Sequence, residues 1–175
     1  FVPSARYRNR VPAGWLSLLV NAGEGIDVDL FLYKQDKVKT IERIGRRIRL
    51  NRSKIKDASD TNTDFDDLAE SIQSGYYLKN GLAANEEFYY IAILITVTGY
   101  SAKEVEWRAK EMRKLLNAQD LDTVSCLFQE EQAFLSALPL LKLEKSIYER
   151  SKRNVLTSGA ASCYPFTSFE MSDKD

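Results

Sequence analysis

The stretch Phe88–Phe128 decides the fold, and it divides into FYYIAILITVTG (88–99), SAKEVEWRAKEMRKLLNAQD (101–120) and LDTVSCLF (121–128). The first part is the longest apolar run of the chain and is rich in β-branched and aromatic residues, which predicts a buried strand over Phe88–Thr98. The second part has apolar residues at helical spacing, and Ser101 with Glu104 forms an S-x-x-E capping box. The third part predicts a strand over Asp122–Leu127. We therefore expect this stretch to form a strand, a helix and a second strand.

Two further strands are expected before this stretch. Trp15–Asn21 is a short apolar run, and Ile26–Tyr33 alternates between apolar and other residues with a period of two. The turn Gly23-Glu24-Gly25 favours a hairpin between them over a dinucleotide-binding loop, because Val28 stands where that motif requires a third glycine. The two runs are therefore predicted to pair as an antiparallel hairpin.

A strongly basic helix is predicted after this hairpin. Asp36 is expected to cap it, and Lys37–Lys56 carries nine cations against the single acid Glu42. Such a helix either binds phosphates or an acidic partner, or is neutralised by its neighbour. The neighbour is a predicted acidic helix with Thr63 as its N-cap and Asn80-Gly81 as its end. The candidate patch consists of Arg43, Arg46, Arg47, Arg49 and Arg52.

Other side chains allow two interpretations each. Asp27 and Asp29 share one face of a strand, where they either hold a cation or belong to a solvated sheet face. The aromatic run Phe88–Tyr90 either stacks on bases or packs inside the protein. Trp107 lies off the apolar stripe of its helix, so it either contacts a partner or is covered by the N-terminal segment. The candidate interface residues are Trp107, Phe31 and Tyr33.

Composition limits the chemistry that this chain can perform. Lys and Arg number 25, as do Asp and Glu, so no overall charge draws the chain to nucleic acid or to a membrane. The sequence has no histidine, which excludes Ser-His-Asp and Cys-His catalysis. Its two cysteines, Cys126 and Cys163, form no metal-binding pattern. No G-x-x-x-x-G-K-[ST] motif is present. A small enzyme that relies on carboxylates is the least favoured interpretation.

The predicted elements indicate an α+β fold with a mixed, roughly four-stranded sheet and helices packed mainly on one face. We expect residues 1–12 to be an extended entry segment and residues 13–138 to be an α+β assembly domain. Residues 139–175 are expected to be a linker that leads toward an absent ATPase domain. Both ends look cut, so the chain is expected to be part of a larger protein.

The C-terminal third carries a resemblance. The run Phe134-Leu135-Ser136-Ala137-Leu138-Pro139-Leu140 is followed by Arg153-Asn154-Val155-Leu156, and then by Ala160-Ala161 and Tyr164-Pro165-Phe166. This order resembles the region before the nucleotide-binding core of VirB/TraC-type ATPases of type IV secretion and conjugative transfer, in particular those of Gram-positive conjugative elements. The matching residues are Phe134, Leu138, Pro139, Arg153, Pro165 and Phe166.

The resemblance implies a parent ATPase that is cytoplasmic and peripheral at the inner face of the cell membrane. This chain would be its non-catalytic N-terminal domain, which docks to membrane-embedded channel components and supports self-association. ATP and magnesium would bind to the parent protein, and no cofactor is expected in this chain. The alternative function is a nucleic-acid-binding module that uses the helix Lys37–Lys56, with DNA as its partner.

Overall fold

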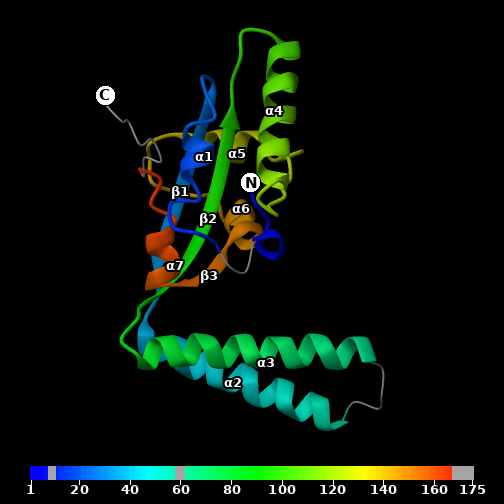
Figure 1. The fold of residues 1–175 in the computed structure, drawn as a ribbon, viewed down its shortest axis with the longest axis vertical. Helices are drawn as coiled ribbons and strands as arrows, with labels where there is room; N and C mark the ends of the chain where they lie inside the picture. Colours follow the sequence, from blue (N-terminus) through cyan, green and yellow to red (C-terminus); the bar gives the residue numbers. More distant parts are fainter. Residues whose placement is uncertain (8–10, 58–61, 167–175) are drawn as a thin grey trace, which may run out of the picture. The chain divides into compact units, whose positions relative to one another are not determined.

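The computed structural model describes residues 1–7, 11–57 and 62–166, and these residues form an α+β fold (Figure 1). Its antiparallel sheet has the strand order β1 (Ile26–Lys34), β2 (Phe88–Val97) and β3 (Arg153–Leu156). The α+β class is therefore confirmed. In the described residues the sheet has three strands where four were expected, and it is antiparallel where a mixed sheet was expected.

The helices differ widely in length. A short 3-10 helix, Ser4–Arg6, comes first. The α-helices are α1 (Ser17–Val20), α2 (Lys37–Asp57), α3 (Asn62–Ala83), α4 (Ala102–Asn117), α5 (Glu130–Ala137), α6 (Lys145–Ser151) and α7 (Thr157–Ser162).

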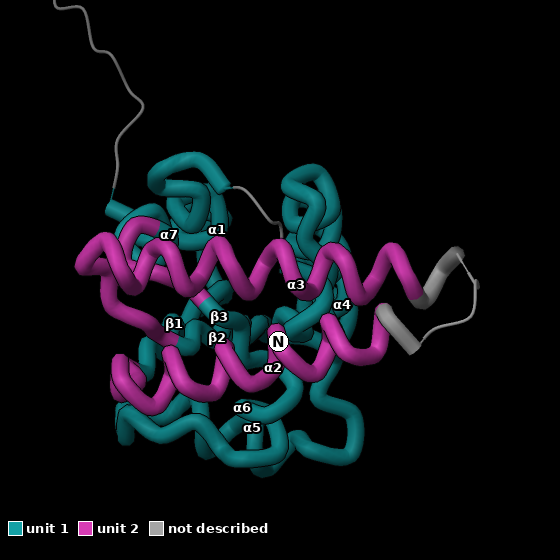
Figure 2. The backbone as a smooth tube through the Cα atoms, turned by 90° about the horizontal axis from the view of Figure 1, so that it is seen from below, with its two compact units in different colours: residues 1–33, 90–154, 159–175 teal, residues 34–89, 155–158 magenta. Residues whose placement is uncertain are grey.

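The chain divides into two compact units, coloured separately in Figure 2. Unit 1 comprises residues 1–33, 90–154 and 159–175, and unit 2 comprises residues 34–89 and 155–158. Unit 2 is built around the antiparallel pair α2 and α3. Unit 1 contains most of the sheet together with α1, α4, α5 and α6.

Strand β2 is the centre of the core, as its apolar sequence predicts. Ile91, Ala92, Ile93 and Leu94 are all buried, so β2 is covered on both faces at this point. On one face, Ala92 and Leu94 belong to a cluster with Phe1, Leu143 and Ile147. This cluster fixes the C-terminal half of unit 1 against the sheet.

The strand predicted at Trp15–Asn21 is wrong, and so is the hairpin built on it. Residues 17–20 of that run form α1, one turn of helix. Leu16 and Leu19 are buried, whereas Leu18 and Val20 are exposed. This spacing of three residues places the buried side chains on one face of a helix. A short apolar run does not by itself distinguish a strand from a helix.

The strand predicted at Asp122–Leu127 is also wrong. The segment is irregular, and it pairs with the start of the chain: the Phe1 nitrogen donates to the Val124 carbonyl at 3.0 Å, and the Val124 N–H donates to the Phe1 carbonyl at 2.9 Å. Asp120 and Phe128, on either side of the segment, have φ angles of 56° and 60°. These left-handed residues interrupt the extended backbone that a sheet strand requires.

Two of the three predicted helix caps agree with the structure. Asp36 Oδ1 accepts a hydrogen bond from the Lys39 N–H at 2.8 Å, and Ser101 Oγ accepts one from the Glu104 N–H at 3.2 Å. Helix α3 begins at Asn62, one residue before the third expected cap, Thr63, so Thr63 lies inside the helix and is not its N-cap. The side chain of Thr63 is outside the described part of the structure.

Helix α3 ends later than Asn80-Gly81. It continues to Ala83, and Asn85 takes the left-handed conformation with a φ of 68°. A side chain at Gly81 would overlap the Leu156 side chain, so this glycine permits close packing and is not the helix stop.

The stretch 139–175, which the sequence predicts as a linker, contains α6, β3 and α7. Leu143, Ile147 and Leu156 are buried. Residues 167–175 lie outside the described part of the chain.

Candidate interaction site

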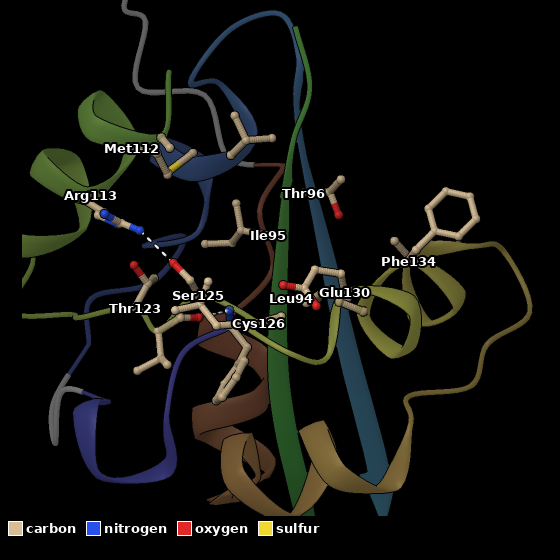
Figure 3. Close-up of a pocket in the computed structure, with 17 residues that line it drawn as sticks. Leu94, Ile95, Thr96, Met112, Arg113, Thr123, Ser125, Cys126, Glu130 and Phe134 are labelled. Atoms are coloured by element: carbon tan, nitrogen blue, oxygen red, sulfur yellow. Dashed lines mark hydrogen bonds between the residues drawn. The ribbon is translucent and has the colours of Figure 1, made fainter. Parts of the chain in front are cut away.

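An apolar pocket of about 430 Å³ lies in unit 1, and we call it the α4–α5 pocket (Figure 3). Five parts of the chain line it: Phe1, the end of β2 (residues 94–97), α4, the irregular segment 123–127 and α5. Large apolar contributors include Leu94, Ile95, Met112 and Val124. Segment 123–127, which is not part of the sheet, forms one wall of the pocket.

Two charged residues line the α4–α5 pocket, one on each flanking helix. Arg113 on α4 donates a hydrogen bond to Ser125 Oγ at 2.8 Å (Figure 3). Glu130 on α5 accepts a hydrogen bond from the Phe128 N–H at 3.0 Å. The pocket therefore has an apolar interior between a guanidinium and a carboxylate.

Three large apolar side chains stand exposed beside this pocket, and we call them the apolar rim: Leu127, Phe128 and Phe134. Their exposed fractions are 69%, 97% and 66%. Leu127 and Phe134 also line the pocket, and the Phe134 ring points away from β2 (Figure 3). Phe128 combines full exposure with a left-handed φ of 60°, a conformation that costs a non-glycine residue roughly 1–2 kcal/mol.

The first resemblance motif lies on α5 and just after it. Phe134 belongs to the apolar rim, Leu138 is half-buried after the last turn of α5, and Pro139 is exposed. Ser136 between them is buried; its hydroxyl donates to the Gln132 carbonyl at 2.7 Å and accepts from the Glu144 N–H at 3.0 Å. Sequence reasoning missed this serine, which joins α5 to the start of α6.

The later motif residues lie apart from the pocket. Arg153 is half-buried at the start of β3, and its guanidinium donates to the Ser4 carbonyl at 3.3 Å. Pro165 is half-buried and Phe166 is exposed, with its ring edge-on to Tyr164 at 5.5 Å between ring centroids. None of these three residues lines the pocket.

The three candidate interface residues have different surroundings. Trp107 on α4 is 63% exposed. Phe31 and Tyr33 on β1 are partly buried and pack against the core cluster, where the Tyr33 hydroxyl accepts from the Leu143 N–H at 3.3 Å. Tyr33 also meets Tyr148 edge-on at 5.1 Å. The structure does not bring Trp107 together with either β1 residue at the α4–α5 pocket.

The candidate cationic patch is exposed along α2. Arg46, Arg47 and Arg49 all face solvent, and the Arg52 guanidinium donates to the Tyr76 hydroxyl on α3 at 3.2 Å. Arg43 is exposed as well. The patch therefore lies on unit 2, whereas the α4–α5 pocket lies on unit 1.

Two ionisable groups outside the pocket, a cysteine thiol and an aspartate carboxyl, have a pKa that burial raises. Burial raises the pKa of the Cys163 thiol, and burial followed by the charge of Asp27 raises the pKa of Asp29. Within the described residues, no three His, Cys, Asp or Glu side chains gather closely enough to hold a metal ion. None of the described helices has the length and apolar character needed to cross a lipid bilayer.

Arg113, Ser125, Leu127 and Phe128 were not predicted as site residues. Segment 121–128 predicts a regular strand, and no local pattern indicates that its end turns outward beside α5. Comparisons with protein-family models, with curated proteins and with solved structures found no match to this chain.

Proposed function

We propose that this chain is a non-catalytic assembly domain of a VirB/TraC-type ATPase of type IV secretion or conjugative transfer. In this role it docks to membrane-embedded channel components and self-associates. The observation that carries the proposal is the position of the motif residue Phe134 in an exposed apolar rim beside a pocket. Exposed apolar side chains gathered around a concavity are typical of protein interfaces.

The catalytic chemistry is assigned to the parent protein. The chain has no G-x-x-x-x-G-K-[ST] motif, the loop whose backbone N–H groups cradle phosphates. We therefore expect ATP and magnesium to bind to another part of the parent ATPase. Its expected location is peripheral at the cytoplasmic face of the cell membrane, where it docks to the channel components.

The proposal is tested by substitution in the parent protein. Phe134→Asp is expected to lower the frequency of conjugative transfer at least about tenfold, since apolar anchors carry much of the binding energy of an interface. Tyr77→Asp is the matched control, because Tyr77 has the same 66% exposure but lies on α3. Equal transfer by the two variants, at equal protein levels, would count against the proposal.

The non-catalytic assignment has its own test. Titration of residues 1–175 with magnesium and ATP in a calorimeter is expected to give no heat of binding. Saturable nucleotide binding would contradict the assignment. Sequencing beyond Asp175 provides a further check, because the proposal expects a G-x-x-x-x-G-K-[ST] motif a short distance downstream.

A second candidate function is nucleic-acid binding by α2. It is favoured by the exposure of Arg46, Arg47 and Arg49 on a helix that carries nine cations between Lys37 and Lys56. A row of exposed guanidinium groups attracts a phosphate backbone regardless of its sequence.

Fluorescence anisotropy with a labelled single-stranded DNA tests this second function. Binding should weaken steeply with salt and disappear when Arg46, Arg47 and Arg49 are all changed to Glu. The control changes three exposed lysines of unit 1, Lys103, Lys110 and Lys145, to Glu, which alters the net charge equally. If both triple variants lose binding alike, the attraction is not specific to α2.

A further inference from the structure

We propose that the α4–α5 pocket and its apolar rim form a two-fold interface with a second copy of this chain, in which Phe134 of each copy enters the pocket of the other. This inference rests on the self-association included in the proposed function and names the surface that carries it. Both the apolar and the charged residues of this surface support it.

The apolar residues combine a concave pocket with exposed aromatic rings beside it. Phe134 lines the pocket, and its ring points away from β2 (Figure 3). Phe128 is almost completely exposed, so a small molecule inside the pocket would leave its ring in water. To cover Leu127, Phe128 and Phe134 together, a partner needs a contact area of the size found in protein–protein interfaces.

The charged residues of this surface indicate that the covering protein is a second copy of the chain. A two-fold interface places the same patch on both copies, so the patch must be complementary to itself. This surface offers Arg113 on α4 and the acidic first turn of α5, Glu130 and Glu131. Within one copy, Glu130 accepts the Phe128 N–H and one Arg113 nitrogen donates to Ser125 Oγ. We assign the contact with the second copy to the exposed Glu131 carboxylate and the remaining N–H groups of Arg113.

Glu131 and Phe134 are three residues apart on α5, so they lie on the same side of the helix. In the proposed interface, Phe134 of one copy enters the opposite pocket, and Glu131 of that copy pairs with the Arg113 that lines this pocket. The two-fold axis then repeats the pair. The net charge of the chain is zero, so no overall repulsion opposes the association.

Sedimentation equilibrium of residues 1–175 tests the inference. Over about a hundredfold range of protein concentration, the mass is expected to rise from monomer to dimer by mass action. Phe134→Glu should raise the dissociation constant at least about tenfold, whereas Tyr77→Glu should not change it. A chain that stays monomeric at every concentration, or a dimer indifferent to Phe134→Glu, overturns the proposal.

Charge reversal gives a readout that a folding defect does not imitate. Arg113→Glu and Glu131→Arg should each be monomeric, because each homodimer would oppose like charges twice. Mixed in equal amounts, the two variants should form a heterodimer of wild-type affinity, since both cross-pairs are then opposite in sign. A mixture that remains monomeric overturns the proposed pairing.

Different results would contradict the two-fold interface and the proposed function. If residues 1–175 stay monomeric while Phe134→Asp in the parent protein still blocks transfer, the two-fold interface is wrong and the assembly function stands. If the chain dimerises through Phe134 while transfer is unaffected, the interface stands and the proposed function is wrong.

Discussion

Asp29 is an acidic side chain placed where its charge is disfavoured. It lies half-buried on β1, next along the same strand face to Asp27 and to the inward-packed Phe31. Burial, and after it the charge of Asp27, raises the pKa of Asp29. The folded state therefore holds the proton of Asp29 more tightly than the unfolded chain does.

This raised pKa predicts how the effect of an Asp29 substitution on stability changes with pH. Above both pKa values Asp29 is ionised in the folded and the unfolded state, and the folded state bears the free-energy cost of its disfavoured charge. As the pH falls through the folded pKa, protonation removes this cost. Asp29→Asn should therefore raise Tm at pH 7, and the gain should vanish toward about pH 3. Asp27→Asn, which removes only the smaller cause, should give a smaller gain.

Thermal unfolding followed by circular dichroism at a series of pH values measures this effect. A Tm at pH 7 that is unchanged by Asp29→Asn would contradict the prediction. So would a gain that grows in acid, because that would mean that the pKa of Asp29 is lowered by folding.

At the residue scale, the sequence predicted the role of a side chain correctly where its hydrogen-bond partner lies close by in the sequence. The caps Asp36 and Ser101 were predicted because the bond they make spans three residues. Ser136 was not predicted, because its partner Glu144 lies eight residues away and on the far side of a proline. The exposure of Phe128 depends on a left-handed backbone that its sequence does not require.

The close packing of α2 against α3 depends on a glycine, Gly75, which has no side chain. A Cβ atom at Gly75 would lie 2.8 Å from Ile48 Cγ1, and Ile48 is buried. Near the same point, Asn51 Nδ2 donates to Ser71 Oγ at 2.8 Å. Gly75 therefore allows the two helices to approach closely, at the usual cost of a glycine inside a helix.

A pair of glycine substitutions tests this packing. Gly75→Ala should lower the free energy of unfolding by about 1–2 kcal/mol, because the β-branched Ile48 cannot yield easily and overpacking outweighs the gain in helix propensity. Gly45→Ala on α2 should raise it by about 0.5–1 kcal/mol, because nothing lies within 4 Å of its added Cβ.

Urea denaturation of both variants gives the two values. Effects of the same sign would show that helix propensity alone governs these positions. The close approach at Gly75 would then be absent in solution.

At the element scale, long periodic segments were predicted well and short apolar ones were not. The strand at Phe88–Thr98 and the helix after Ser101 carry their pattern over ten or more residues. Trp15–Asn21 is too short for its period to be read, and the strand β3 has only four residues, Arg153–Leu156. Strand β3 depends on its neighbour β2 for pairing, and its own sequence does not indicate this.

At the scale of the whole chain, α2 and α3 lie between β1 and β2 in the sequence. The ends of β1 and β2 are neighbours: the Gln35 N–H donates to the Phe88 carbonyl at 2.9 Å, and Lys34 pairs with Glu87 at 3.5 Å. Helices α2 and α3 are thus an insertion between two adjacent strands. The sequence order predicted both helices, but not that they leave from and return to neighbouring positions of one antiparallel sheet.

This insertion predicts that unit 1 folds without the helix pair. Replacing Lys37–Ala83 by a short Gly-Ser linker should leave a chain that still unfolds cooperatively. Its Tm should be lower, because Leu156 loses its contact with Gly81. The variant should still dimerise through Phe134, since the whole α4–α5 pocket lies in unit 1, and any DNA binding should be lost with α2. Calorimetry measures the unfolding transition and its Tm, sedimentation measures dimerisation, and fluorescence anisotropy measures DNA binding. A variant without a cooperative transition would mean that unit 1 depends on α2 and α3 for its stability.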